Sequence, residues 1–118
     1  MKLTLLTDNQ VDRGGGLLAE HGLCLLIETG DRKVLLDTGQ TDIGMTNANR
    51  LGVNLDGLDT VMLSHGHYDH GGGLPALLKA RGPLEIIAHP DVFASKYARE
   101  PGKPERFIGL AYGSDDLI

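Results

Sequence analysis

The stretch Ser64-His65-Gly66-His67-Tyr68-Asp69-His70-Gly71-Gly72-Gly73 follows an apolar run and decides both the fold and the chemistry. Three of the five histidines and one carboxylate fall within six of its residues. Residues two apart in an extended segment point the same way, so His65, His67 and Asp69 can share one side. His70 adds a fourth donor after the chain begins to turn. Because zinc and iron bind imidazole nitrogens and carboxylate oxygens, the stretch predicts a metal site.

The glycines of this stretch shape the predicted site. Gly66 lets the backbone pack closely, and residues 71–73 allow a turn into a helix that begins at Leu74. The positive N-terminal end of that helix would face the site and favour a bound hydroxide or an anionic group. The alternative is a surface histidine cluster or a cloning tag. A tag would be a terminal homopolymer, whereas this cluster ends an apolar strand, where sites of α/β proteins usually lie.

The remaining chain is predicted to alternate between apolar strands and short helices. The turn Thr29-Gly30-Asp31-Arg32 suits a tight hairpin between two strands, and Gly52 is expected to end a helix. The order of elements is typical of a mixed α/β arrangement. The predicted strands cover residues 3–7, 23–28, 33–37, 59–63 and 84–88, and the helices 41–51 and 74–80, with a helical turn or two over 91–97 and a charged, solvated loop over 99–106.

The composition excludes several classes of function. A length of 118 residues limits the chain to one domain, and 11 basic against 16 acidic side chains give a net charge of -5 (11 − 16). That charge, an aromatic content of 4% and the absence of a basic stripe in the sequence disfavour a nucleic-acid partner. The longest apolar run, Leu23 to Ile27, is far below the ~20 residues of a membrane span, so no membrane partner is expected.

The cysteine content and the N-terminus indicate a cytoplasmic setting. Cys24 is the single cysteine, so no intrachain disulfide is available and a reducing compartment is expected. Its place in an apolar run predicts a small side chain in the core. The start Met1-Lys2-Leu3-Thr4 has neither the apolar region nor the cleavage site of a signal peptide.

The motif and its surroundings resemble a known family. His65-Gly66-His67-Tyr68-Asp69-His70 is similar to the signature of the metallo-β-lactamase-fold metallohydrolases. Asp37 matches that family's upstream aspartate, which closes the strand before the first helix. The chain resembles in particular the dihydropterin ribofuranosyl-aminobenzene phosphate synthase-like branch. Its pattern is echoed by Glu20-His21-Gly22-Leu23, Asp37-Thr38-Gly39-Gln40, Asn47-Ala48, Leu51-Gly52-Val53 and Ala88-His89-Pro90-Asp91.

The resemblance implies a role for each residue of the motif. His65 and His67 would bind one metal ion, and Asp69 and His70 a second, with a hydroxide between the two ions. Asp69 would also orient that hydroxide, which makes it the predicted catalytic residue. Asp37 would hold the surrounding loop by hydrogen bonds without binding metal itself. The expected cofactor is zinc, as one or two divalent ions, with manganese or iron as alternatives.

Three further residues are candidate contacts in a substrate pocket. His21 stands at the start of a strand near the expected mouth of the site. Tyr68 lies between the ligands, where it either donates a hydrogen bond to the substrate or packs to keep the loop rigid. His89 ends a strand beside a proline; we interpret it as a structural or substrate-facing histidine and give metal binding less weight.

The resemblance also implies what residues 1–118 do not supply. The family completes its site with later residues: a third histidine for the first metal, a bridging carboxylate and a final histidine for the second metal. Residues 1–118 offer roughly two ligands per metal, where a catalytic zinc normally has three from protein. We therefore interpret them as a single partial domain, the N-terminal half of an αββα sandwich. Its expected architecture is a mixed, mostly antiparallel sheet with helices on one face.

A half sandwich leaves an apolar sheet face in contact with water, which soluble proteins rarely do. We therefore expect self-association as a homodimer, or association with a missing C-terminal half. Two functions remain open at this point. One is a metal-dependent hydrolase of small molecules, with activated-hydroxide chemistry at a dinuclear site completed in a longer chain or assembly. The other is a non-catalytic fragment or binding module that retains the metal-binding loop.

Overall fold

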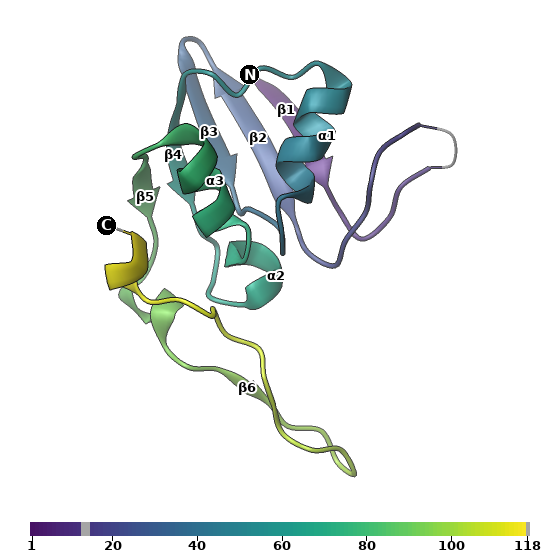
Figure 1. Ribbon diagram of the computed structural model, residues 1–118, viewed down its shortest axis with the longest axis vertical. Coiled ribbons are helices and arrows are strands. Elements are labelled where there is room, and N and C mark those ends of the chain that lie inside the picture. Colours follow the sequence, from purple (N-terminus) through teal and green to yellow (C-terminus); the bar gives the residue numbers. More distant parts are fainter. Residues whose placement is uncertain (13–14, 118) are drawn as a thin grey trace.

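A five-stranded sheet is the framework of the fold. The computed structural model describes residues 1–12 and 15–117. The first two strand pairings are antiparallel and the last two are parallel (Figure 1). The sequence predicts a mostly antiparallel sheet, but the two kinds of pairing are equal in number because the chain crosses over through a helix after the third strand and again after the fourth. In spatial order the strands are β1 (Lys2–Thr7), β2 (Cys24–Thr29), β3 (Arg32–Leu36), β4 (Leu58–Met62) and β5 (Glu85–Ile87).

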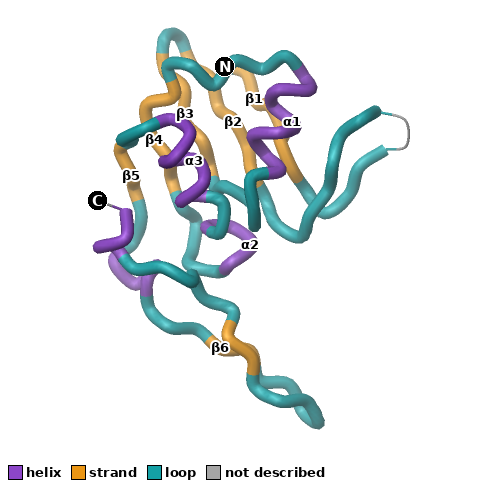
Figure 2. The backbone as a smooth tube through the Cα atoms, viewed as in Figure 1, coloured by secondary structure: helices purple, strands orange, loops and turns teal. Residues whose placement is uncertain are grey.

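Helices α1 (Ile43–Leu51) and α3 (Leu74–Arg81) lie over one face of the sheet, as predicted, and the short helix α2 (Tyr68–Gly71) lies at the end of the sheet (Figures 1 and 2). Two short 3₁₀ turns follow, η1 (Pro90–Phe93) and η2 (Ser114–Leu117). Within residues 1–12 and 15–117, no helix combines the length and the apolar character that a membrane crossing requires.

The ends of α1 follow from local hydrogen bonds. The helix begins at Ile43, two residues later than predicted, because the Glu20 carboxylate binds the N–H and the hydroxyl of Thr41 at 3.2 and 2.7 Å outside the helix. It ends, as predicted, before Gly52, whose φ of +70° is the left-handed conformation that glycine adopts readily.

The core lies between the sheet and the helices. Leu26, Leu35 and Val61 form one cross-strand row on the helix side, and each is at most 3% exposed. Leu74 and Leu77 of α3 are equally buried and belong to the same cluster. Burial of each such side chain stabilises the fold by roughly 1.5–3 kcal/mol. This packing fixes the helices on the sheet and thereby fixes the loops at its edge.

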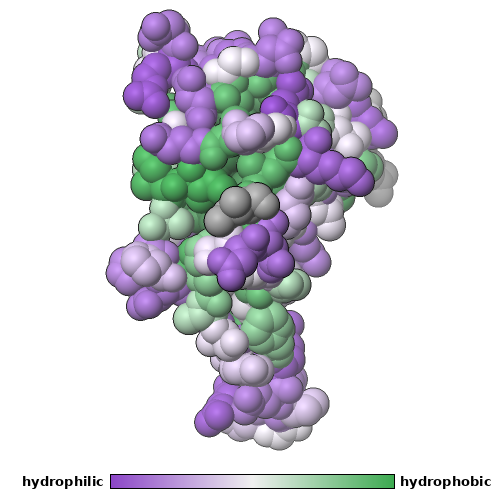
Figure 3. Space-filling view, turned by 60° about the vertical axis from the view of Figure 1, so that its left-hand side comes forward, coloured by the Kyte–Doolittle hydropathy of each residue, from purple (hydrophilic) through white to green (hydrophobic). Residues whose placement is uncertain are grey.

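The opposite face of the sheet carries a second apolar row, which we call the outer row. Leu5, Leu25, Leu36, Met62 and Ile87 are cross-strand neighbours that run from β1 to β5. Leu5, Met62 and Ile87 are exposed to 49%, 39% and 48%. Figure 3 shows apolar side chains gathered on the side of the molecule where β5 lies. The sheet is therefore apolar on both faces, although helices cover only one.

A hairpin, which we call the arm, projects from the end of the sheet (Figure 1). Its strands β6 (Tyr97–Ala98) and β7 (Arg106–Phe107) are antiparallel. The prediction of a helical turn or two over residues 91–97 is correct only at its start, because η1 ends at Phe93. The Lys96 ammonium binds the carbonyls of residues 91, 92 and 94, which closes the turn, and the next residue enters β6. The charged stretch 99–106 forms the tip of this hairpin, and its strand β7 begins at the last residue of that stretch.

Candidate metal centre

The histidine-rich stretch lies at the edge of the sheet where β3 and β4 end. Because β3 and β4 are parallel, their C-terminal ends meet at the same edge, the usual place for a site in this kind of sheet. Asp37 follows β3 immediately, and its N–H donates to the carbonyl of Met62 at 2.8 Å. Residues 64–73, which we call the metal loop, begin just beyond β4. Two segments distant in sequence are thus placed side by side.

Asp37 is the hydrogen-bonding centre of this edge. It is completely buried and has a φ of +58°, a conformation that aspartate tolerates better than most residues. One carboxylate oxygen, Oδ1, accepts the backbone N–H of Ser64 at 2.7 Å. The other, Oδ2, accepts the Ser64 hydroxyl and lies 2.7 Å from His70 Nδ1. Both oxygens accept hydrogen bonds, so Asp37 holds the metal loop in place, and its carboxylate also groups with His65 and His70 in a set that could hold a metal ion.

This network fixes the tautomers of two histidines. A carboxylate can only accept, so Nδ1 of His70 carries a proton, and in the neutral ring Nε2 presents a lone pair. The Ser64 hydroxyl donates to Asp37 and therefore accepts from His65 Nδ1, 2.8 Å away. His65 thus also presents the lone pair of Nε2. The buried Asp37 carboxylate thus orients both rings. It binds His70 directly and His65 through Ser64, for which the sequence predicts no role.

The metal loop brings the four predicted ligands together. One donor atom from each of His65, His67 and Asp69 lies within 4.8 Å of the other two. The His65 ring lies 4.2 Å from that of His70 and 4.6 Å from that of His67. Burial, followed by the neighbouring His70 and His67, lowers the pKa of His65 below its ordinary value of 6.5. The neutral ring, which is the form that binds metals, is therefore favoured.

The loop reaches this arrangement by a different route from the predicted one. Only its first part is extended; from Tyr68 the chain forms the short helix α2, so Asp69 and His70 lie on a helical turn. At the start of α3 the N–H of Gly73 donates to the Gly39 carbonyl and to the Thr38 hydroxyl, each at 3.1 Å, which ties this helix to the segment after β3.

Comparison with known proteins identifies the family. A family model described as the metallo-beta-lactamase superfamily matches residues 18–117. The chain belongs to this superfamily. A crystal structure of a metal-dependent hydrolase of the beta-lactamase superfamily superposes with a TM-score of 0.73 over 98% of the chain, at 28% identity. The fold and the family expected from the histidine-rich motif are therefore confirmed.

Two curated relatives from Methanocaldococcus jannaschii extend the likeness. One is an uncharacterized protein, 36% identical over 92% of this chain. The other is 7,8-dihydropterin-6-methyl-4-(beta-D-ribofuranosyl)-aminobenzene-5'-phosphate synthase, 31% identical over 86% of this chain, which agrees with the branch resemblance. The chain spans 40% and 36% of the lengths of these relatives, and 38% of the superposed hydrolase.

Two of the three candidate pocket residues lie together beside the superfamily motif. His21 Nε2 is 3.0 Å from Asp69 Oδ2, and the ring of Tyr68 is centred 6.3 Å from that of His21. Asn9, which the sequence analysis did not assign to the site, binds the other ring nitrogen of His21 at 3.2 Å. The loop after β1 therefore reaches the metal loop.

His89 lies on the other side of the motif. Its Nδ1 accepts the N–H of Asp91 at 3.1 Å and so caps the start of η1. It also lines a cavity of about 170 Å³ beside His65, together with Leu63, Ser64, Gly66, Asp91, Val92 and Lys96. A Cβ on Gly66 would overlap the carbonyl oxygen of Val92, which explains why glycine is needed at that point of the superfamily motif.

The base of the arm is tied to the metal loop. The N–H of Tyr68 donates to the carbonyl of Ile108 at 3.1 Å. The hydroxyl of Tyr112 donates to the carbonyl of Gly71 at 2.6 Å, and burial raises the pKa of Tyr112 to about 12, so the phenol remains a donor. The loop is therefore held from the C-terminal side as well as by Asp37.

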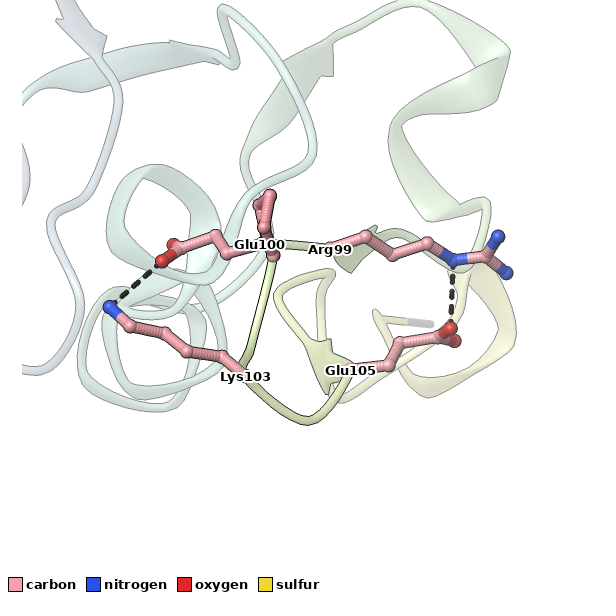
Figure 4. A pocket seen from close by; sticks show the side chains of 5 residues that line it. Arg99, Glu100, Lys103 and Glu105 are labelled. Atoms are coloured by element: carbon pink, nitrogen blue, oxygen red, sulfur yellow. Dashed lines mark hydrogen bonds and ion pairs between the residues drawn. The ribbon is translucent and has the colours of Figure 1, made fainter.

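A larger hollow, about 630 Å³, lies at the tip of the arm and is separate from the metal loop. The four charged side chains that line it pair with one another (Figure 4). Arg99 Nε binds Glu105 Oε2 at 2.8 Å, and Lys103 Nζ binds Glu100 Oε2 at 2.9 Å. These pairs satisfy the charges of a solvated hairpin tip, and none belongs to the cluster of predicted ligands.

Proposed function

We propose that the chain supplies the metal-binding loop of a metal-dependent hydrolase that acts on a small molecule. The observation that carries this proposal is the Asp37 network, which leaves the Nε2 lone pairs of His65 and His70 free beside His67 and Asp69. A set of imidazoles with one carboxylate suits zinc, with manganese or iron as alternatives.

The four side chains divide into two pairs in this proposal. His65 and His67 hold one ion, and Asp69 and His70 hold the second. Bound divalent ions would lower the pKa of water and polarise a substrate oxygen. Asp69, which is 8% exposed, accepts a hydrogen bond from the attacking water and orients it. Asp37 keeps His70 in the tautomer that can bind.

The proposed site needs ligands beyond those of the metal loop. Four side chains give two ligands for each of two ions, and a catalytic zinc normally takes three from protein. The chain spans about two fifths of the length of its relatives. We infer that the working hydrolase takes its remaining ligands from a longer chain or from an assembly.

A small molecule fits this site better than a nucleic acid. The cavity beside His65, about 170 Å³, has room for one compact group, and the synthase of Methanocaldococcus jannaschii supports a small-molecule substrate for this branch. A net charge of -5 opposes the binding of a phosphodiester polymer. Titration with a fluorescent single-stranded RNA at low salt should show no binding. Binding that weakens steeply with added salt would contradict this part of the proposal.

Metal binding tests the proposal directly. We expect the purified chain to bind zinc or manganese weakly in calorimetric titration, and to retain it in elemental analysis when the ion is present in excess. His67→Ala should reduce the bound metal. His89→Ala is the matched control, because that ring is 76% exposed and caps η1, and it should bind as the wild type does.

The outcomes separate the two functions. Metal binding that depends on His67 supports the hydrolase site. A folded wild-type chain without any measurable zinc or manganese binding would contradict it and would favour the non-catalytic fragment or binding module. Equal metal content in His67→Ala and wild type would overturn the ligand assignment.

A further inference from the structure

Asn9, His21 and Asp69 form a chain of hydrogen bonds, and of these three residues only Asp69 is a predicted metal ligand. Asn9 Oδ1 accepts the N–H of Gly22 at 2.8 Å, which fixes the orientation of the Asn9 amide. Its Nδ2 therefore faces His21 Nδ1, 3.2 Å away. An amide nitrogen can only donate, so His21 Nδ1 accepts and the ring proton lies on Nε2. His21 Nε2 then donates to Asp69 Oδ2 over 3.0 Å.

The backbone around His21 is built to hold this contact. Gly22 has a φ of +135°, and a Cβ at that position would overlap the carbonyl oxygen of Asp69. The segment before β2 is therefore packed directly against the backbone of α2. The His21 side chain is 62% exposed and that of Asp69 is 12% exposed, so the hydrogen bond approaches a nearly buried carboxylate from its open side.

The hydrogen bond from His21 determines how the Asp69 carboxylate faces the other predicted ligands. Asp69 Oδ2, which accepts from His21, also lies 3.6 Å from His70 Nε2, so the oxygen that His21 holds is the one that faces a predicted ligand. Both ring nitrogens of His21 are engaged, one as an acceptor and one as a donor. The ring therefore acts on the predicted metal centre through Asp69.

We propose that His21, oriented by Asn9, is a positioning residue that holds the Asp69 carboxylate toward His70 for metal binding. This inference rests on the proposed function of Asp69 as a metal ligand. It assigns to two residues outside the histidine-rich motif a part in the metal centre. Hydrogen-bond partners of ligands typically change metal affinity by about 10–100-fold when they are removed.

Cobalt(II) binding provides a test with a spectroscopic readout. Cobalt reports its ligands through its visible absorption bands, and titration gives the affinity. We expect His21→Ala to weaken cobalt binding by about tenfold or more and to change the bands. His21→Gln, whose amide can donate from a position near that of Nε2, should restore both. Asn49→Ala, at an exposed position of α1, should resemble wild type.

A second variant tests the orientation of His21 without removing the ring. Asn9→Asp replaces the donor facing Nδ1 by an acceptor and should also weaken cobalt binding, whereas Asn49→Asp adds the same charge at an exposed position and should not. A purely structural role would lower the unfolding temperature but leave the cobalt bands unchanged.

The failures of the two proposals are distinguishable. If wild type binds cobalt and His21→Ala and Asn9→Asp bind it with the same affinity and the same bands, the positioning role is overturned while the proposed function stands. If folded wild type does not bind cobalt, the proposed function fails and this inference fails with it.

Discussion

Asp37 and His70 are joined by a hydrogen bond of 2.7 Å between a fully buried carboxylate oxygen and Nδ1 of the ring. The two residues are 33 positions apart, and the contact links the end of β3 to the short helix α2. The same oxygen accepts the Ser64 hydroxyl, so both sides of the metal loop are fixed at a single atom. The metal loop is thus organised around a residue outside it.

Asp37→Asn should therefore weaken metal binding more than it weakens the fold. Asparagine adopts the left-handed conformation readily and keeps the shape of the side chain. Its amide has a single acceptor oxygen, so it accepts either the Ser64 N–H or the Ser64 hydroxyl and His70 Nδ1, and its nitrogen faces the remaining donor; the contacts that orient His70 are weakened in either case. We expect zinc affinity to fall by about 10–100-fold in calorimetric titration. Asp31→Asn, an exposed hairpin position, is the control, and equal affinities of the two variants would contradict the role of Asp37.

Gly66→Ala should destabilise the metal loop through steric overlap alone. The new methyl group would meet the carbonyl oxygen of Val92, and backbone atoms cannot move aside easily. We expect a loss of about 1–3 kcal/mol in the free energy of unfolding, measured by urea denaturation. Gly113→Ala, where the nearest atom is 3.9 Å away, should cost much less. Equal losses would show that η1 does not pack on the loop as described.

The thiol of Cys24 should be protonated and slow to react in the folded chain. Burial first, and then the charges of Asp37 and Glu20, raise its pKa from 9.0 to about 12. At pH 8 we expect Ellman's reagent to modify it far more slowly in buffer than in urea. Fast modification of the folded chain would contradict this burial.

The same shift predicts a loss of stability at alkaline pH. Between pH 9 and about 12 the unfolded thiol loses its proton while the folded thiol keeps it, so the free energy of unfolding decreases as the pH rises. Stability from this group is complete below pH 9. Cys24→Ala removes the titrating group, and its free energy of unfolding should vary less steeply over that range, even if it is lower at pH 7. Parallel curves for the two proteins would contradict the assigned shift.

The outer row should drive self-association of the isolated chain. In a purified solution, the apolar surface available to cover Met62 and Ile87 is that of a second copy, and contiguous exposed apolar faces mark interaction sites. We expect light scattering to show a dimer at micromolar concentration. Replacement of Met62 and Ile87 together by lysine should give a monomer, whereas Leu51→Lys, on α1, should not. A folded wild-type monomer would contradict this prediction.

Much of the fold could be predicted from local patterns. The strand before the metal loop and the helix that ends at Gly52 lie within two residues of their expected bounds, because apolar runs and capping glycines act over short distances. Helix α2 is not predicted, because its four residues, the last of them a glycine, are too few to show a helical period. The strands of the arm were missed because each has only two residues.

The candidate site, like the fold, could be predicted from the sequence only where its residues are close together along the chain. The four predicted ligands lie within six residues, so their spacing could be recognised in the sequence. The hydrogen bonds that orient them join residues distant in sequence: Asp37 lies 33 positions from His70 and 27 from Ser64, and Asn9 lies 12 from His21. Tertiary packing creates these pairs, and a single sequence has no local signal for them.

The cavity beside His65 is built from two separate stretches of chain, the metal loop and residues 89–96 after β5. The first carries the predicted chemistry, and the second supplies most of the opposing wall. The shape of the cavity can therefore vary through residues 89–96 without a change in the predicted ligands, except where the Val92 carbonyl meets Gly66 and accepts from Lys96 at 3.3 Å.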